Sequence, residues 1–284
     1  MAISYARFPG HWGFDAGVSP PWQMVPVGGM RFLMVSGTFG LIPRLHIPSG
    51  SAASLTVTES FAATYSLLKL KGIRAGKAFI DWAPPGTSLS DPFASEGTLE
   101  VSVKAQKVVG TAFHYVEAGR RQTTARRISD LEGMIQGAND VLTPQANVKL
   151  ESTSAKILNM RQRLGKVVHD ASDLDKPWKR DEWEIVTRNA DPSADFNVFF
   201  VREFEDDATP RADRTDAATR WWELNCIIED DTRHDASEVL AHETIHLLRL
   251  GHSTKAAHLS APGYLRTGTT ITRDQANIIN RSGT

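Results

Sequence analysis

The feature of this sequence that most constrains its fold is a set of three histidines, His242, His246 and His252, within eleven residues. Positions i and i+4 of a helix lie on one face, one turn apart, so His242 and His246 would present their rings together. If the helix continued, His252 would lie about 240° round the axis from His246. We therefore expect the helix to end and the chain to turn back at Gly251, because glycine tolerates positive φ.

The residues around these histidines predict a buried helix. Asp235-Ala236-Ser237-Glu238 has the character of a helix start, with an acid at the fourth position as in a capping box. Apolar residues then recur at helical spacing, at Val239, Leu240, Leu247 and Leu250. We therefore expect His242 and His246 to lie on a helix that packs against a core.

Three neutral imidazoles are typical ligands of a catalytic zinc ion that keeps one position open for water. Such an ion lowers the pKa of its water to about 7. Glu243, next to the first histidine, can take the proton as the zinc-bound water attacks a peptide carbonyl, and can pass it to the leaving amine. The pattern predicts Zn²⁺ as cofactor, His242, His246 and His252 as ligands, and Glu243 as general base and acid.

The third ligand has alternatives. No Glu follows Glu243, and Asp274 is the only later acid, so His252, His258 and Asp274 are the candidates. The required turn favours His252. His258 is explained more simply as a histidine of a surface loop.

This motif resembles that of the metzincin clan of zinc metallopeptidases, His-Glu-x-x-His-x-x-Gly-x-x-His followed by a Met-turn. The residues that match are His242, Glu243, His246 and His252. The resemblance implies a zinc-dependent endopeptidase acting on protein or peptide substrates. It also implies an α+β catalytic domain, with a mixed twisted sheet, a long helix, a zinc helix and a C-terminal helix.

Two positions depart from the family pattern. Arg249 stands where the family has glycine, so either Arg249 carries backbone strain or the helix runs longer before it turns. Ser260 stands where the Met-turn has methionine, within His258–Pro262. Tyr264 follows that segment and is a candidate for stabilising the oxyanion, as a tyrosine near there does in some metzincins.

The resemblance covers about residues 110–284, and we place the peptidase domain at 119–284. Helical spacing runs from Ile128 to Leu142, and a strand is expected to start within Pro144–Val148. Phe196–Val201 is a predicted strand, either the edge strand that pairs with substrate or a core strand. We also expect a strand at Leu224–Ile228 and a capped helix from Thr272, and we expect Trp221-Trp222 to lie in the core rather than line a pocket.

The N-terminal third predicts a small all-β domain. Short alternating runs separated by turn residues recur at Arg31–Val35, Ser54–Val57, Tyr65–Leu70, Lys77–Asp81 and Thr98–Val103. This spacing is typical of a β-sandwich, and the segments 72–78 and 98–103 resemble the closing half of bacterial immunoglobulin-like domains. We therefore expect an N-terminal extension at 1–30 and an immunoglobulin-like sandwich at 31–118.

Composition limits the partners. With 32 basic and 33 acidic residues the chain has a net charge of −1. It therefore lacks the positive electrostatic field that would attract nucleic acid. No segment is long enough to insert into a membrane. The single cysteine, Cys226, excludes an internal disulfide framework, and its apolar surroundings predict a buried small side chain rather than a nucleophile.

The start of the chain lacks the basic and apolar regions of a signal peptide. Most metzincin-like peptidases are exported, so this lack leaves three alternatives: a leader that has been lost, a protein that is cytoplasmic in its producer, or secretion by a leaderless route such as a contractile injection system. We expect a protein that is cytoplasmic in its producer, with the leaderless route as the alternative. That route would make the protein an effector or toxin, with a secretion-machine component or an immunity protein as partner. Two other functions stay open: a catalytically degenerate binding or delivery protein, and a zinc amidase acting on cell-wall peptide.

Overall fold

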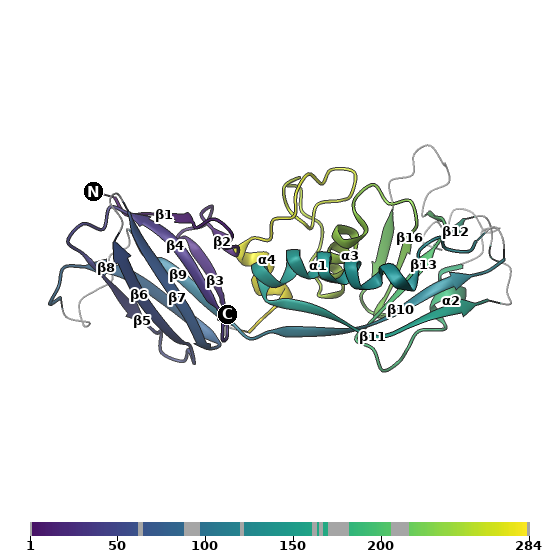
Figure 1. Cartoon of the computed structure of the whole chain (residues 1–284), viewed down its shortest axis with the longest axis horizontal. Helices are drawn as coiled ribbons and strands as arrows, with labels where there is room; N and C mark the ends of the chain where they lie inside the picture. The colour runs from purple at the N-terminus through teal and green to yellow at the C-terminus, as the bar shows by residue number, and fades with distance from the viewer. Residues whose placement is uncertain are drawn as a thin grey trace. The chain divides into compact units, whose positions relative to one another are not determined.

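The computed structural model describes residues 2–61, 65–87, 97–119, 122–160, 164, 167–169, 182–205 and 216–282. It is an α+β protein, with far more strand than helix. The chain forms two compact units (Figure 1). The first comprises Met1–Lys107, Leu142–Val148 and Ile271–Thr284, and the second comprises Val108–Val141 and Lys149–Thr270.

The first unit contains two β-sheets. One has the strand order β1-β4-β7-β6, with β1 (Ser4–Arg7), β4 (Met30–Ser36), β6 (Ser54–Phe61) and β7 (Ser66–Arg74). The other has the order β2-β3-β9-β8-β5, with β2 (Phe14–Asp15), β3 (Trp22–Pro26), β5 (Ile42–His46), β8 (Gly76–Ala83) and β9 (Leu99–Lys104). All these pairings are antiparallel except that of β3 with β9.

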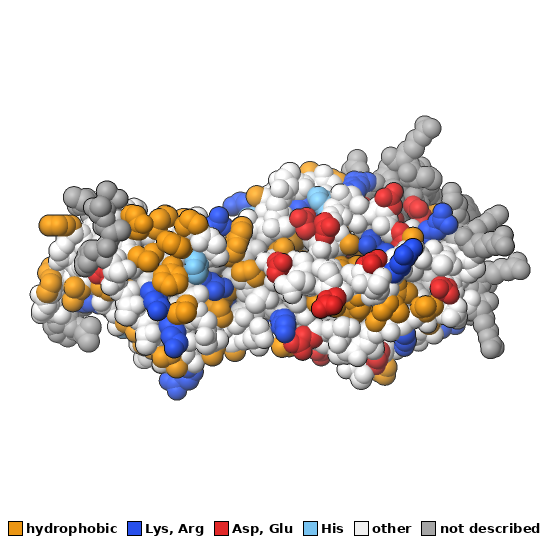
Figure 2. Space-filling model, in the orientation of Figure 1, with side chains coloured by type: hydrophobic (Ala, Val, Ile, Leu, Met, Phe, Trp, Pro, Cys, Tyr) orange, Lys and Arg blue, Asp and Glu red, His pale blue; other side chains and the backbone are white. Residues whose placement is uncertain are grey.

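The two sheets share one apolar core. Leu33 and Leu70 from the first sheet pack with Val25, Ile80 and Val101 from the second, and all five are fully buried. The alternation of buried and exposed residues along β7 is what a strand with one covered face requires. Figure 2 shows that this unit also carries hydrophobic side chains on its outer surface, beside a few basic ones.

The strands expected at 31–35, 54–57, 65–70, 77–81 and 98–103 correspond to β4, β6, β7, β8 and β9. The compact units, however, divide the chain at positions other than 30 and 118. β1, β2 and β3 come from the first thirty residues and pair within the two sheets. β10 (Lys107–Glu117), expected in the sandwich, belongs to the sheet of the second unit.

The sheet of the second unit has the order β11-β10-β13-β16-β15. Besides β10 it contains β11 (Val148–Asn159), β13 (Phe196–Val201), β15 (Ala217–Arg220) and β16 (Asn225–Glu229). β10, β13 and β16 are parallel, and β15 runs antiparallel to β16 at the edge. Phe196–Val201 is therefore a central strand, and the alternative that made it the substrate-pairing edge was wrong.

The central strands are buried on both faces, as parallel strands usually are. On one face Phe199 and Ile227 pack against Trp183 and Val186 of α2 (Glu182–Thr187). α3 (Ala236–Leu247) contacts β15 and β16, and α1 (Leu131–Ala146) runs close beside α3 (Figure 1). A Cβ added at Gly137 of α1 would lie 2.5 Å from the Ser237 hydroxyl, so only glycine allows this close approach.

Helix α1 extends further than the sequence predicts. α1 continues through Pro144 to Ala146, and β11 begins only at Val148, because a proline in the last turn removes a single hydrogen bond from the helix. α4 (Arg273–Ile279) begins with the expected capping box between Thr272 and Gln275.

Two short strands, β12 (Val168–His169) and β14 (Phe204–Glu205), form a separate parallel pair. Among the described helices, none has the length and apolar character needed to cross a bilayer.

Candidate metal centre

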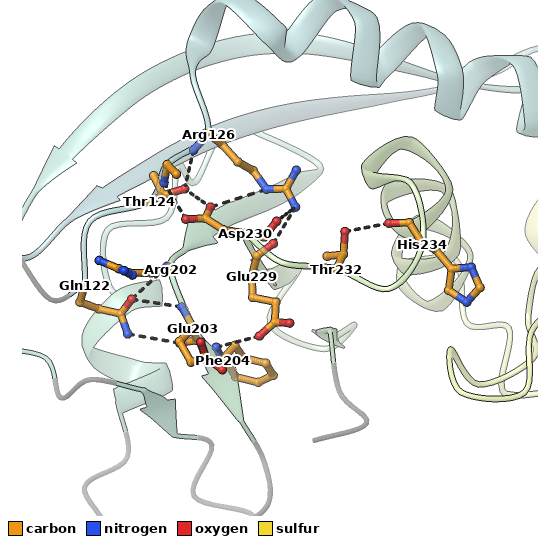
Figure 3. A network of polar contacts seen from close by, with 11 residues as sticks. Gln122, Thr124, Arg126, Arg202, Glu203, Phe204, Glu229, Asp230, Thr232 and His234 are labelled. Atoms are coloured by element: carbon orange, nitrogen blue, oxygen red, sulfur yellow. Dashed lines mark hydrogen bonds and ion pairs between the residues drawn. The ribbon is translucent and has the colours of Figure 1, made fainter. Parts of the chain in front are cut away.

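The segment that leads into α3 is held by a polar network at the end of β16 (Figure 3). The Asp230 carboxylate accepts a hydrogen bond from the Thr124 hydroxyl. The Arg126 guanidinium donates to the carbonyl oxygens of Glu229 and Asp230, at 2.7 and 3.1 Å. The Glu229 carboxylate accepts from the Phe204 N–H at 3.2 Å. The network fixes the carboxyl end of a central strand directly before the helix that carries the histidines.

α3 begins and ends as a helix with defined caps. The Asp235 carboxylate accepts the Ser237 N–H at 2.9 Å, which confirms the predicted helix start. The helix ends at Leu247, and the chain reverses at Arg249, whose φ is 70°. The positive φ therefore falls on Arg249 and not on Gly251, so the expectation that Gly251 provides the turn was wrong. Of the two alternatives for Arg249, backbone strain is the one found.

The turn brings the three histidines together. Ligand nitrogens of His242, His246 and His252 all lie within 4.8 Å of one another. The Nε2 atoms of His242 and His246 are 3.0 Å apart. Two nitrogens on a tetrahedral zinc, each about 2.0–2.1 Å from the ion, are separated by about 3.3 Å. The spacing therefore fits a shared metal ion.

Backbone carbonyls fix which nitrogen of each helical histidine faces the centre. His242 Nδ1 lies 2.6 Å from the Leu259 carbonyl oxygen, and His246 Nδ1 lies 2.6 Å from the Leu250 carbonyl oxygen. A carbonyl only accepts, so each Nδ1 carries the proton and each Nε2 offers a lone pair. This second layer of contacts is what metal-ligating histidines usually have.

The three histidines have lowered pKa values, which favours the neutral form that binds a metal cation. Burial, with the neighbouring His246, lowers the pKa of His242 to about 2. Burial also lowers the pKa of His246 and of His252. All three rings are therefore neutral near pH 7, and no proton has to leave before they coordinate.

Glu243 is buried next to this cluster. Burial raises its pKa to about 7, although hydrogen bonding to Thr219 and the charge of Arg266 act in the opposite direction. The Thr219 hydroxyl donates to Glu243 Oε2 at 2.6 Å. A carboxyl group whose pKa lies near neutrality can both accept and release a proton at working pH.

One cavity of about 570 Å³ joins these groups. Its lining includes all three histidines, Glu243, the edge strand β15 with Thr219, and the segment Pro262–Tyr264. Tyr264 is half exposed there. Trp221 also lines the cavity, with 41% of its surface exposed, and Trp222 is 64% exposed, so the expectation that this pair lies in the core was wrong.

The other candidate residues lie outside the cluster. The ligand group found among the described residues does not include His258 or Asp274. His258 Nδ1 pairs with the Ser253 hydroxyl at 2.8 Å, and Asp274 pairs with Arg273 at 3.0 Å. Ser260, at the place of the family's methionine, is fully buried. Cys226 is buried as expected, and burial raises the pKa of its thiol.

Sequence reasoning missed two residues of the site. Thr219 and Arg266 both line the cavity beside Glu243, yet each is more than twenty residues away from it in sequence. Thr219 comes from an edge strand of four residues, and Arg266 directly follows the turn at 263–265. Neither stands in a motif, so no local pattern pointed to them.

Comparisons with known proteins give little beyond this geometry. No family model and no curated protein matches the chain. Among solved structures, metalloproteinase-II from Bacteroides fragilis is similar at 11% identity and a TM-score of 0.37, covering 90% of this chain and 84% of that one. A cysteine protease inhibitor from Entamoeba histolytica is similar at 14% identity and a TM-score of 0.19, covering 29% of this chain and 86% of that one. At these TM-scores neither likeness identifies a fold or a function.

Proposed function

We propose that this protein is a zinc-dependent endopeptidase of metzincin type. The observation that carries the proposal is the meeting of His242, His246 and His252 beside the buried Glu243 in one cavity. Three imidazoles with an open side are the ligand set of catalytic rather than structural zinc. The immunoglobulin-like character of the first unit is part of the same proposal, supported by its two packed sheets.

In this proposal the chain's own groups position the substrate and move a proton. An extended peptide would pair with the outer edge of β15, which borders the cavity and is the last strand of its sheet among the described residues. Glu243 would accept a proton at its carboxylate and deliver it to the leaving amine, while Thr219 holds Oε2 in place. Bound zinc would supply Lewis-acid polarisation of the scissile carbonyl. Tyr264 is our candidate for a further donor to the developing oxyanion.

The first test is metal content, measured by mass spectrometry on the purified protein after reconstitution. We expect about one zinc per chain, and an affinity lowered at least tenfold in His252→Ala, because a coordinating nitrogen is lost. His258→Ala is the matched control and should bind zinc as the wild type does. Absence of zinc from the wild type would overturn the proposal and favour the degenerate binding protein.

The second test is hydrolysis of casein. Glu243→Ala should bind zinc but lose turnover, because the proton acceptor is removed. Glu184→Ala, an exposed acid on α2, is the matched control. Equal turnover by Glu243→Ala would refute the mechanism. Release of peptide from purified peptidoglycan without casein cleavage would favour the amidase.

Export by a leaderless route, a role as effector or toxin, and an immunity partner remain proposals from the sequence. A cell fractionation experiment on the producing organism, with the protein detected in the medium or in the cytoplasm, tests the first of them.

A further inference from the structure

The cavity contains a buried cation that the proposed mechanism does not use. Arg266 lines the cavity and is only 5% exposed. Two of its guanidinium nitrogens, Nε and Nη1, have no hydrogen-bond partner among the described residues. Buried donors on a charged group are costly to leave unsatisfied. The guanidinium therefore has donors that could bind an acceptor group of a ligand.

The acids near Arg266 are engaged elsewhere. Asp216 accepts the Arg233 N–H at 2.8 Å and pairs with the Arg233 guanidinium at 3.6 Å. Glu243 accepts the Thr219 hydroxyl at 2.6 Å. These carboxylates act on Arg266 through their charge without satisfying its free donors.

Glu238, the third acid that acts on Arg266 through its charge, lies 3.8 Å from His234 Nδ1. Burial lowers the pKa of the Arg266 guanidinium, and the charges of the surrounding acids raise it. An arginine stays protonated under such opposing influences, so its positive charge is permanent.

Arg266 is also close to the candidate metal site. Its charge contributes to the lowered pKa of His242 and of His246. Arg266 and the three histidines line the same cavity, so a substrate bound at the histidines would also border the guanidinium. A carboxylate suits these donors, because its negative charge strengthens each hydrogen bond that it accepts from the guanidinium.

We propose that Arg266 selects substrates that carry a carboxylate beside the bond to be cleaved. This inference rests on the proposed peptidase function and adds a substrate class to it. The carboxylate has two chemical sources, the side chain of an Asp or Glu residue and the free carboxyl terminus of a peptide. A cavity of about 570 Å³ has room for either.

The test compares binding and cleavage of matched peptides. Zinc-loaded Glu243→Ala protein, which is catalytically silent under the proposed mechanism, is titrated with fluorescent peptides capped at both ends that carry Glu or Gln at each position in turn. At one position the Glu peptide should bind about tenfold to a hundredfold more tightly, the range expected for hydrogen bonds to a charged group. A second pair of peptides has uncharged side chains and either a free or an amidated carboxyl terminus. Comparing their binding measures recognition of the terminal carboxylate separately.

Variants assign any preference to Arg266. In the same silent background, Arg266→Gln should bind the Glu and Gln peptides within about twofold of each other, because the positive charge and the guanidinium donors are lost. Arg266→Lys should keep part of the preference. Arg188→Gln, which removes an exposed positive charge outside the cavity lining, is the matched control and should keep all of it.

The outcomes separate the two proposals. Equal binding of all Glu and Gln peptides, and of free and amidated termini, overturns the carboxylate inference even if casein is cleaved. A preference that persists in Arg266→Gln overturns the assignment to this residue. A charge preference without cleavage by the wild type supports carboxylate recognition by Arg266 but overturns the peptidase function, and with it the role of Arg266 in selecting substrates. Because the Glu and Gln comparison needs no change at Arg266, a folding failure of Arg266→Gln leaves it decisive.

Discussion

Replacing Glu243 by Gln should stabilise the metal-free protein, and only at neutral and alkaline pH. Burial raises the pKa of this carboxyl from 4.5 to about 7. Between these values the folded protein holds a proton that the unfolded chain releases, so the stability contributed by Glu243 is present below pH 4.5 and is lost as the pH rises toward 7. At about 1.36 kcal/mol per pKa unit, the full loss is roughly 3 kcal/mol. Glutamine cannot ionise, so the Glu243→Gln variant does not lose this stability as the pH rises.

The measurement is urea denaturation at pH 5 and pH 8, with a chelator present and tryptophan fluorescence as the signal. The free energy of unfolding of Glu243→Gln should exceed that of the wild type by roughly 2–3 kcal/mol more at pH 8 than at pH 5. Glu184→Gln, which removes an exposed acid, is the control and should show no such rise. A Glu243→Gln difference that stays constant between the two pH values would refute the argument that buried charge causes the effect.

Three further substitutions test the geometry around the site. Arg249→Gly removes a left-handed non-glycine residue, which costs about 1–2 kcal/mol, and should raise the midpoint of thermal unfolding by a few degrees; a lower midpoint would mean that the arginine side chain stabilises more than its backbone costs. Asp235→Ala should lower the free energy of unfolding by about 1 kcal/mol in urea, because the N-cap of α3 is lost, whereas Asp235→Ser should keep most of it; equal loss in both would contradict the cap. Thr219→Val should lower kcat about tenfold with little change in KM, because the carboxylate of Glu243 loses the donor that positions it, and Thr219→Ser should restore it; a change confined to KM would assign Thr219 to substrate binding.

Much of the secondary structure could be predicted because its signals are local. The strands β4, β7 and β9 follow from alternation between turn residues, and the caps of α3 and α4 follow from Asp235 and Thr272. The signal for the candidate metal site is also local, since the three candidate ligands and the candidate base lie within eleven residues. In each case the residues that determine the feature are close neighbours in the chain.

The features that sequence reasoning missed depend on contacts between distant residues. Phe196–Val201 has the same β-forming composition in the centre of a sheet as it would have at an edge, and only pairing with β10 and β16 decides its place. The reversal at Arg249 likewise depends on the surrounding structure, because the arginine stacks over Trp221 with 5.0 Å between guanidinium and ring centre. Arg266 lies in the cavity lining directly after a turn that no sequence motif marks.

The interleaved composition of the first unit has a consequence for how the chain folds as it is made. Strands β1 to β9 precede residue 108, but the same unit also needs Ile271–Thr284. The buried Lys104 amine, for example, donates to the carbonyl oxygens of Asn280 and Ser282, at 2.6 and 3.0 Å. At the usual pace of translation these acceptors leave the ribosome on the order of ten seconds or more after the lysine. The second unit is therefore synthesised completely while the first still lacks its last segment, and expressing residues 31–118 alone would remove that segment altogether.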